Sequence, residues 1–94
     1  MKTLNIKVFA NFREICGGKI VSMEVVDEET ILNILKQLIT KFPQMQEELF
    51  TETFELKPMI HVFINGKNVM YLNGLDTKVS QQDTVALFPP VAGG

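Results

Sequence analysis

The sequence predicts one small domain of the α+β class, in which several strands gather around one main helix. Near both ends of the chain apolar residues alternate with polar ones, which is the period of a half-buried strand. Between these regions apolar residues recur every three or four positions, which is the period of a helix face. The 94 residues, 46% of them hydrophobic, suffice for one core and leave no room for a second domain.

Composition and charge exclude several classes of protein. Nine basic and eleven acidic residues give a net charge of −2, so we expect no nucleic-acid partner. No segment approaches the roughly 18 apolar residues of a membrane span, so we expect no membrane association. The strand pattern starts directly after Met1, which predicts no signal peptide and a cytoplasmic location. With Cys16 as the only cysteine, we expect neither an internal disulfide nor a metal site.

The first strand is predicted at residues 3–9, because every second residue from Leu4 to Val8 is apolar. Phe9 then falls on the face of the strand that points away from the core. We expect a bend at Cys16-Gly17-Gly18 and a second strand at residues 21–25. The short connection predicts that the two strands form an antiparallel hairpin.

The main helix is predicted from Ile31 to Phe42, where apolar residues follow the helical period. Thr30 is expected to cap it, because its hydroxyl accepts a hydrogen bond from a free N–H of the first turn. The acidic residues 27–29 suit the positive end of the helix dipole. Pro43 is expected to end this helix and to start a short second one that carries apolar residues as far as Phe50.

The second half of the chain predicts further strands. Residues 59–64 alternate Ile60, Val62 and Ile64 with residues of the opposite face. Asn65-Gly66 then favours a tight hairpin turn. The remaining segments are a return strand at 67–71, irregular chain at 72–79, a turn at 81–83 and a last strand at 85–88.

These elements predict a β-grasp, or ubiquitin-like, roll. If the first and last strands lie side by side in the middle, a mixed sheet clasps the main helix on one face. Residues 1–88 form this domain, and residues 89–94 form an extended, flexible C-terminal tail that ends in Gly-Gly.

The residue types of the tail are those expected of a segment that extends from the domain and presents its terminal carboxylate to a partner. Pro89 and Pro90 lack N–H groups and are expected to direct the chain outward. Because Gly93 and Gly94 have no side chains, we expect them to fit a slot in a partner that is too narrow for other residues. A carboxylate is a poor electrophile until it is activated, usually as an adenylate. Because the chain has no phosphate-binding loop and no Ser/His/Asp set, we expect another protein to activate it. The alternative is that the two glycines are frayed residues without a role.

Three segments resemble the MoaD/ThiS sulfur carriers. Residues 3–9 followed by Ala10-Asn11-Phe12-Arg13-Glu14 resemble their first strand and "FAxxRE" segment. Ile64-Asn65-Gly66 and the last segment, 88–94, resemble the same group, and the diproline points to the small subunit of molybdopterin synthase rather than the thiamine-pathway carrier. In place of the Gly-Asp turn frequent in the family, this chain has Gln82-Asp83.

The resemblance implies a non-catalytic carrier that binds no cofactor itself. A ubiquitin-activating-type adenylyltransferase would use ATP and magnesium to adenylate Gly94, and a sulfur donor would replace AMP to leave a thiocarboxylate. The large synthase subunit would pass this sulfur to cyclic pyranopterin monophosphate, forming the dithiolene of molybdopterin. Gly93 and Ala92 would keep the tail thin, and the preceding Pro89, Pro90 and Val91 would aim and anchor it.

Other functions remain open from the sequence. The thiocarboxylate would equally serve tRNA thiolation or cysteine or thiamine synthesis. Gly94 would alternatively be joined to lysines of other proteins, as in a ubiquitin-like modifier. A third alternative is a β-grasp interaction module with an inert tail.

An apolar patch is expected on the sheet face opposite the helix. Phe9 and Phe63, with Met59 and His61, are candidates for docking the activating enzyme and the synthase subunit; the alternative is that loops cover some of them or that they are scattered on the surface. Phe88, directly before the diproline, is a further candidate for partner binding. We interpret His61 as a sheet-face residue rather than a base or ligand, and Cys16 as structural rather than sulfur-handling. Arg13 and Glu14 are expected to pair locally on the surface.

Overall fold

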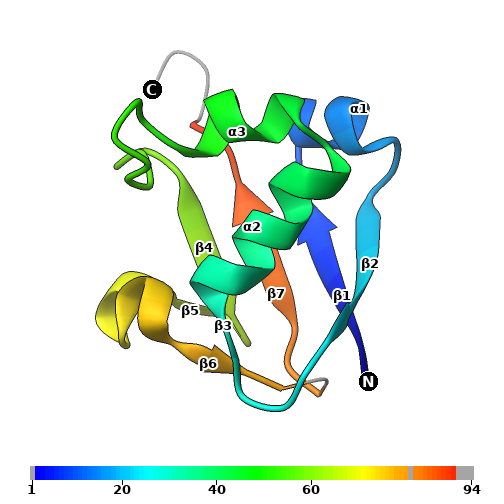
Figure 1. Cartoon of the computed structure of the whole chain (residues 1–94), viewed down its shortest axis with the longest axis vertical. Helices are drawn as coiled ribbons and strands as arrows, with labels where there is room; N and C mark the ends of the chain where they lie inside the picture. Colours follow the sequence, from blue (N-terminus) through cyan, green and yellow to red (C-terminus); the bar gives the residue numbers. More distant parts are fainter. Residues whose placement is uncertain (1, 81, 91–94) are drawn as a thin grey trace.

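The computed structural model describes residues 2–80 and 82–90, with α2 lying across one face of a five-stranded sheet (Figure 1). The strands of this sheet are β1 (Lys2–Val8), β2 (Ile20–Val25), β4 (His61–Ile64), β5 (Lys67–Asn68) and β7 (Val85–Phe88). A second, two-stranded sheet consists of β3 (Glu29–Thr30) and β6 (Lys78–Val79). The helices are α1 (Asn11–Cys16), α2 (Ile31–Lys41) and α3 (Gln44–Leu49), with 3₁₀ turns η1 (Val69–Tyr71) and η2 (Gly74–Asp76).

The first and last strands lie side by side at the centre of the sheet. The strand order is β2-β1-β7-β4-β5, and β1 pairs with β7 in parallel, with Ile6 opposite Val85 and Val8 opposite Leu87. All other pairs in this sheet are antiparallel, including the predicted hairpin of β1 with β2. The predicted β-grasp topology is therefore confirmed.

The core lies between α2 and the sheet. Ile31, Ile34, Leu35 and Leu38 form the buried stripe of α2, and Phe42 packs partly buried against the same core. On the sheet side the fully buried residues include Leu4, Ile6, Val8, Val85 and Leu87. Each such side chain contributes roughly 1.5–3 kcal/mol of transfer free energy to folding, so this interface is the main source of stability.

Both ends of α2 are as predicted. The Thr30 hydroxyl accepts a hydrogen bond from the Asn33 N–H at 3.2 Å, which satisfies a free donor of the first turn. The helix ends at Lys41, and Pro43 stands directly before α3. Met45 and Leu49 of α3 are fully buried, as the apolar spacing indicated.

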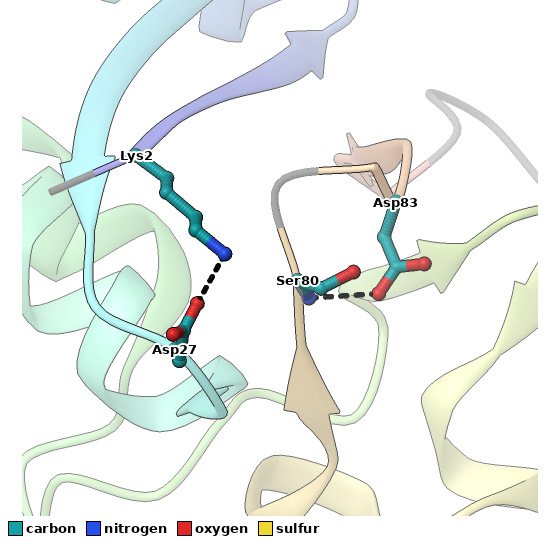
Figure 2. Close-up of polar contacts among 4 residues, drawn as sticks. All are labelled: Lys2, Asp27, Ser80 and Asp83. Atoms are coloured by element: carbon teal, nitrogen blue, oxygen red, sulfur yellow. Dashed lines mark hydrogen bonds and ion pairs between the residues drawn. The ribbon is translucent and has the colours of Figure 1, made fainter.

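The turn predicted at Asn65-Gly66 joins β4 to β5, with φ of 51° and 85°. The Asn65 side chain also holds the turn before β7, because it donates to Asp83 Oδ1 and accepts from the Thr84 N–H, both at 2.9 Å. Asp83 Oδ2 in turn accepts from the Ser80 N–H at 2.9 Å (Figure 2). Two turns distant in sequence are thus fixed to one another.

At the opposite end of the chain an ion pair links β1 to the segment after β2. Lys2 Nζ lies 2.7 Å from Asp27 Oδ1 (Figure 2). The hydrogen bond from Lys2, together with its charge, lowers the pKa of Asp27. Because both side chains are largely exposed, this pair adds little to stability.

Two sequence predictions are wrong in detail, and one element was not predicted. The expected bend is present at Gly17 and Gly18, but residues 11–16 before it form the unpredicted helix α1, whose Phe12 is fully buried. Phe12, Ile15 and Cys16 stand at helical spacing, but six residues are too few for that spacing to establish a period. The return strand spans only residues 67–68, because Asn68 accepts from the Met70 N–H at 2.9 Å and caps η1. Residues 72–79 are not irregular: they contain η2 and β6, which pairs with β3.

We expect Thr30→Ala to lower the free energy of unfolding by about 1 kcal/mol, because it removes the N-terminal cap of α2. Thr40→Ala is the matched control, since the Thr40 hydroxyl bonds only to the Lys36 carbonyl inside the same helix. Urea unfolding of both variants measures the difference. Equal stability of the two would contradict a capping role for Thr30.

Candidate functional site

The C-terminal strand ends at a diproline. His61 opposite Phe88 is the last pair between β4 and β7, and Pro89, which has no N–H to donate, follows directly. Pro89 is buried and Pro90 is exposed. The predicted carrier residues Val91, Ala92, Gly93 and Gly94 lie outside the described residues.

Three phenylalanines gather at this end of β7. Phe9 and Phe88 are stacked, with ring centroids 4.3 Å apart and planes 8° from parallel. Phe63 meets Phe88 edge-on, at 5.3 Å and 67°. We call Phe9, Phe63 and Phe88 the aromatic cluster. Offset and edge-on ring contacts each contribute about 0.5–1.5 kcal/mol beyond burial, so the cluster is held in a defined arrangement.

Strand register explains why these residues meet. Val8 lies opposite Leu87, so the next residues along the two parallel strands, Phe9 and Phe88, are neighbours. Phe63 lies opposite Ala86 on the other side of β7. Because the flanking residues Val8 and Leu87 are buried toward α2, alternation places the aromatic cluster on the opposite face of the sheet.

The aromatic cluster borders a groove of about 750 Å³. Its lining is mainly apolar and consists of Phe9, Ala10, Asn11, His61, Phe63, Phe88, Pro89 and Pro90. The structure therefore brings the predicted partner-binding residues Phe9, Phe63, Phe88, Pro89 and Pro90 to one place. Met59, which the alternation placed with them, is exposed but precedes β4 and does not line this groove.

Arg13 supports the aromatic cluster, a role the sequence did not reveal. Its guanidinium carbon lies 5.0 Å from the centre of the Phe9 ring, and its Nε donates to the Val8 carbonyl at 2.9 Å. The predicted pairing with Glu14 is wrong, because among the described residues Arg13 forms no ion pair with it. The "FAxxRE" segment was the only signal in the sequence. It singled out Arg13 but did not predict its contact with Phe9.

His61 and Cys16 have the environments expected of structural residues. His61 lies edge-on to Phe63 at 6.4 Å, and its Nδ1 is 3.3 Å from Asn68 Nδ2. Cys16 is half-buried against the core, and burial raises the pKa of its thiol, which keeps it protonated near neutral pH.

Two further searches concern only the described part of the chain. Residues 2–80 and 82–90 contain no group of three or more histidine, cysteine or acidic residues placed to hold a metal ion. Within the same residues, no helix has the length and apolar character needed to cross a membrane.

The central parallel pair, the single clasped helix and the position of the last strand define a protein of the ubiquitin-like class. The chain belongs to the ThiS family, whose model matches residues 6–94. It is 37% identical over 91 residues to small archaeal modifier protein 3 of Haloferax volcanii, covering 97% of this chain and 98% of that protein. It is 28% identical over 91 residues to the molybdopterin synthase sulfur carrier subunit of Dictyostelium discoideum, covering 95% and 93%.

Solved structures agree with this assignment. The crystal structure of SAMP1 from Haloferax volcanii superposes with a TM-score of 0.87 at 30% identity, covering 98% of this chain and 99% of that one. A chain of the BexX/CysO complex from Amycolatopsis orientalis gives 0.78 at 27% identity, with 97% and 99% covered. The MoaD/ThiS resemblance is thereby confirmed, and the relatives are small sulfur carriers or modifiers, one of them crystallised in a complex of two proteins.

We expect Cys16 to react slowly with iodoacetamide near neutral pH, because the raised pKa leaves little thiolate. Mass spectrometry should show that alkylation becomes several-fold faster in denaturant, where the thiol is no longer buried. Equally fast reaction of the folded chain would contradict the structural interpretation.

Proposed function

We propose that this protein is a sulfur carrier whose reactive group is the C-terminal carboxylate of Gly94. A ubiquitin-activating-type adenylyltransferase attaches AMP from ATP to that carboxylate, with magnesium, and releases pyrophosphate. Sulfur from a donor then displaces AMP and leaves a thiocarboxylate. The single observation that carries this proposal is the family match, which extends through the Gly-Gly end to residue 94.

The proposed acceptor is cyclic pyranopterin monophosphate, bound by the large subunit of molybdopterin synthase. The chain would be the small, non-catalytic subunit, and its thiocarboxylate would supply the dithiolene sulfur of molybdopterin. The diproline before Gly-Gly and the similarity to a molybdopterin synthase sulfur carrier subunit support this acceptor.

The aromatic cluster is the proposed docking surface for both partners. Its rings are half-buried and lie beside Pro89 and Pro90, so a protein that covers the groove also meets the start of the tail. In this proposal Val91 and Ala92 extend the contact into the partner, and the absent side chains of Gly93 and Gly94 allow passage to its reaction centre.

Protein modification is the second candidate. Similarity to two small archaeal modifier proteins, at 37% and 32% identity, favours it. In that function the same adenylate of Gly94 would lead to an isopeptide bond with a lysine amine. Carriers for tRNA thiolation or for cysteine or thiamine synthesis would share the thiocarboxylate and differ only in the acceptor.

We expect protein isolated from its own cells to show, by intact-mass measurement, the increase that corresponds to replacement of one oxygen by sulfur. Gly94 found in isopeptide bonds would instead support the modifier function. If neither product forms, even when a cognate activating enzyme and ATP are supplied, the carrier function and the modifier function are both contradicted. A co-purifying larger subunit that makes molybdopterin in vitro would identify the acceptor.

Deletion of Gly94 is the control for that measurement. We expect it to abolish the modified mass and to leave the thermal midpoint unchanged, because a terminal glycine contributes little packing. A large fall in the midpoint would indicate that the residue is structural.

We expect Phe63→Glu to weaken binding to the activating enzyme by at least about tenfold, because it places a charge in an apolar contact. Val26→Asp is the control, because it places a charge on an exposed apolar residue that does not line the groove. Calorimetric titration of both variants checks the difference. Equal affinities would contradict docking through the aromatic cluster.

A further inference from the structure

The turn that joins β1 to α1 contains a backbone conformation that alanine rarely adopts. Ala10 has φ of 53° and ψ of −132°, and the Phe12 N–H donates to the Phe9 carbonyl at 3.1 Å. Ala10 thus has the conformation of the first central residue of a type II′ turn, at φ of about +60° and ψ of about −120°, where glycine is the favoured residue. Because a Cβ makes this conformation unfavourable, it persists only where surrounding contacts hold it.

Arg13 contacts each of the three residues that lead into and form this turn. Its Nε–H donates to the Val8 carbonyl at 2.9 Å, and its guanidinium carbon lies 5.0 Å from the centre of the Phe9 ring. Its backbone N–H donates to the Ala10 carbonyl at 3.0 Å. A charged donor makes a stronger hydrogen bond than a neutral one, and a cation is attracted to a ring face. The Arg13 side chain therefore spans the turn and opposes its relaxation.

The position of Phe9 matters because its ring meets the chain where the diproline begins. Backbone pairing between β1 and β7 ends at the residues before Phe9 and Phe88. Beyond that pair, the Phe9 ring is stacked on the Phe88 ring. Pro89 follows directly and has no N–H with which to continue a ladder. The turn at Ala10 therefore supports the last residue before the diproline through a side-chain contact.

We propose that Arg13 is a positioning residue for the reaction of Gly94. This inference rests on the proposed function, in which the Gly94 carboxylate enters the activating enzyme and attacks the α-phosphorus of ATP. Arg13 holds the strained turn, and the turn holds the Phe9 ring against Phe88. The stack in turn sets the direction in which the diproline leaves the domain.

A small change at Phe88 is enlarged at the far end of the tail. Residues 89–94 would span about 20 Å if extended, so a change of about 10° at Phe88 would displace the terminal carboxylate by about 3.5 Å. Each proline fixes its own φ, so the diproline transmits this change rather than absorbing it. A misplacement of about 1 Å at the reacting atoms costs about a hundredfold in rate. Loss of Arg13 should therefore lower turnover more than docking.

The test measures ATP–pyrophosphate exchange by a cognate activating enzyme, with the full chain as its substrate. We expect Arg13→Met to lower kcat by about tenfold and to change the KM for the carrier by less than about threefold, since the three rings remain on the docking face. Lys78→Met is the control for loss of one positive charge, because Lys78 lies in β6 and does not line the groove; its kcat should equal that of the wild type. An unchanged kcat in folded Arg13→Met, or a rise in KM alone, would overturn the proposal.

A second substitution separates positioning from direct contact with the partner. Ala10→Gly keeps the turn conformation accessible without Arg13, because glycine adopts positive φ readily. Added to Arg13→Met, it should restore kcat to within about threefold of the wild type. A double variant as slow as Arg13→Met would indicate that Arg13 acts by touching the partner, and would overturn the proposal. If Arg13→Met does not fold, Arg13→Lys replaces it in each measurement, because an ammonium does not reproduce the rigid guanidinium fork.

The ring contact gives a readout that needs no partner. Proton NOEs between the Phe9 and Phe88 rings should weaken in Arg13→Met and return in the double variant. Unchanged NOEs in Arg13→Met would overturn the proposal, because the stack would then not depend on Arg13. A wild-type chain that is not adenylated at all would contradict the proposed function itself, whereas an adenylated wild type with variants of equal kcat would refute only the positioning role.

Discussion

The parallel pairing of β1 with β7 is the contact on which the rest of the structure depends. It joins the two ends of the chain through Ile6 opposite Val85 and Val8 opposite Leu87, in the middle of the sheet. Because those four side chains are also buried under α2, the same contact closes the core. Without it, β7 would pair only with β4, and the position of Phe88 and the diproline relative to β1 would not be fixed.

That pairing also decides how the two faces of the sheet are used. The face toward α2 is filled by aliphatic residues and provides stability, whereas the opposite face carries the aromatic cluster at the end of β7. Arg13 adds a cation over the Phe9 ring and donates a hydrogen bond to the Val8 carbonyl. An apolar surface with a defined arrangement of rings thus lies where the diproline begins.

Elements that carry a clear local signal were predictable, and elements without one were not. The helical stripe of Ile31–Lys41, the Asn65-Gly66 turn and the strand Val85–Phe88 each carry a local signal, through period or turn chemistry. Helix α1 and the two-residue strands β3 and β6 are too short to show a period, and they form because tertiary contacts stabilise them. The η1 turn replaced a predicted strand because the Asn68 side chain caps the backbone there.

The sequence by itself determined the main strands and the main helix of the β-grasp, together with the buried stripe of α2, because these follow from local periodicity. The sequence predicted that Phe9 and Phe63 lie on the outer face of the sheet, but it did not predict that both rings contact Phe88. Only the tertiary structure decided that Phe9 stacks on Phe88, that Arg13 lies over Phe9, and that Lys41 of α2 reaches the Ser22 carbonyl of β2. These are contacts between segments far apart in the chain, and strand order and register, which no local pattern encodes, bring them together.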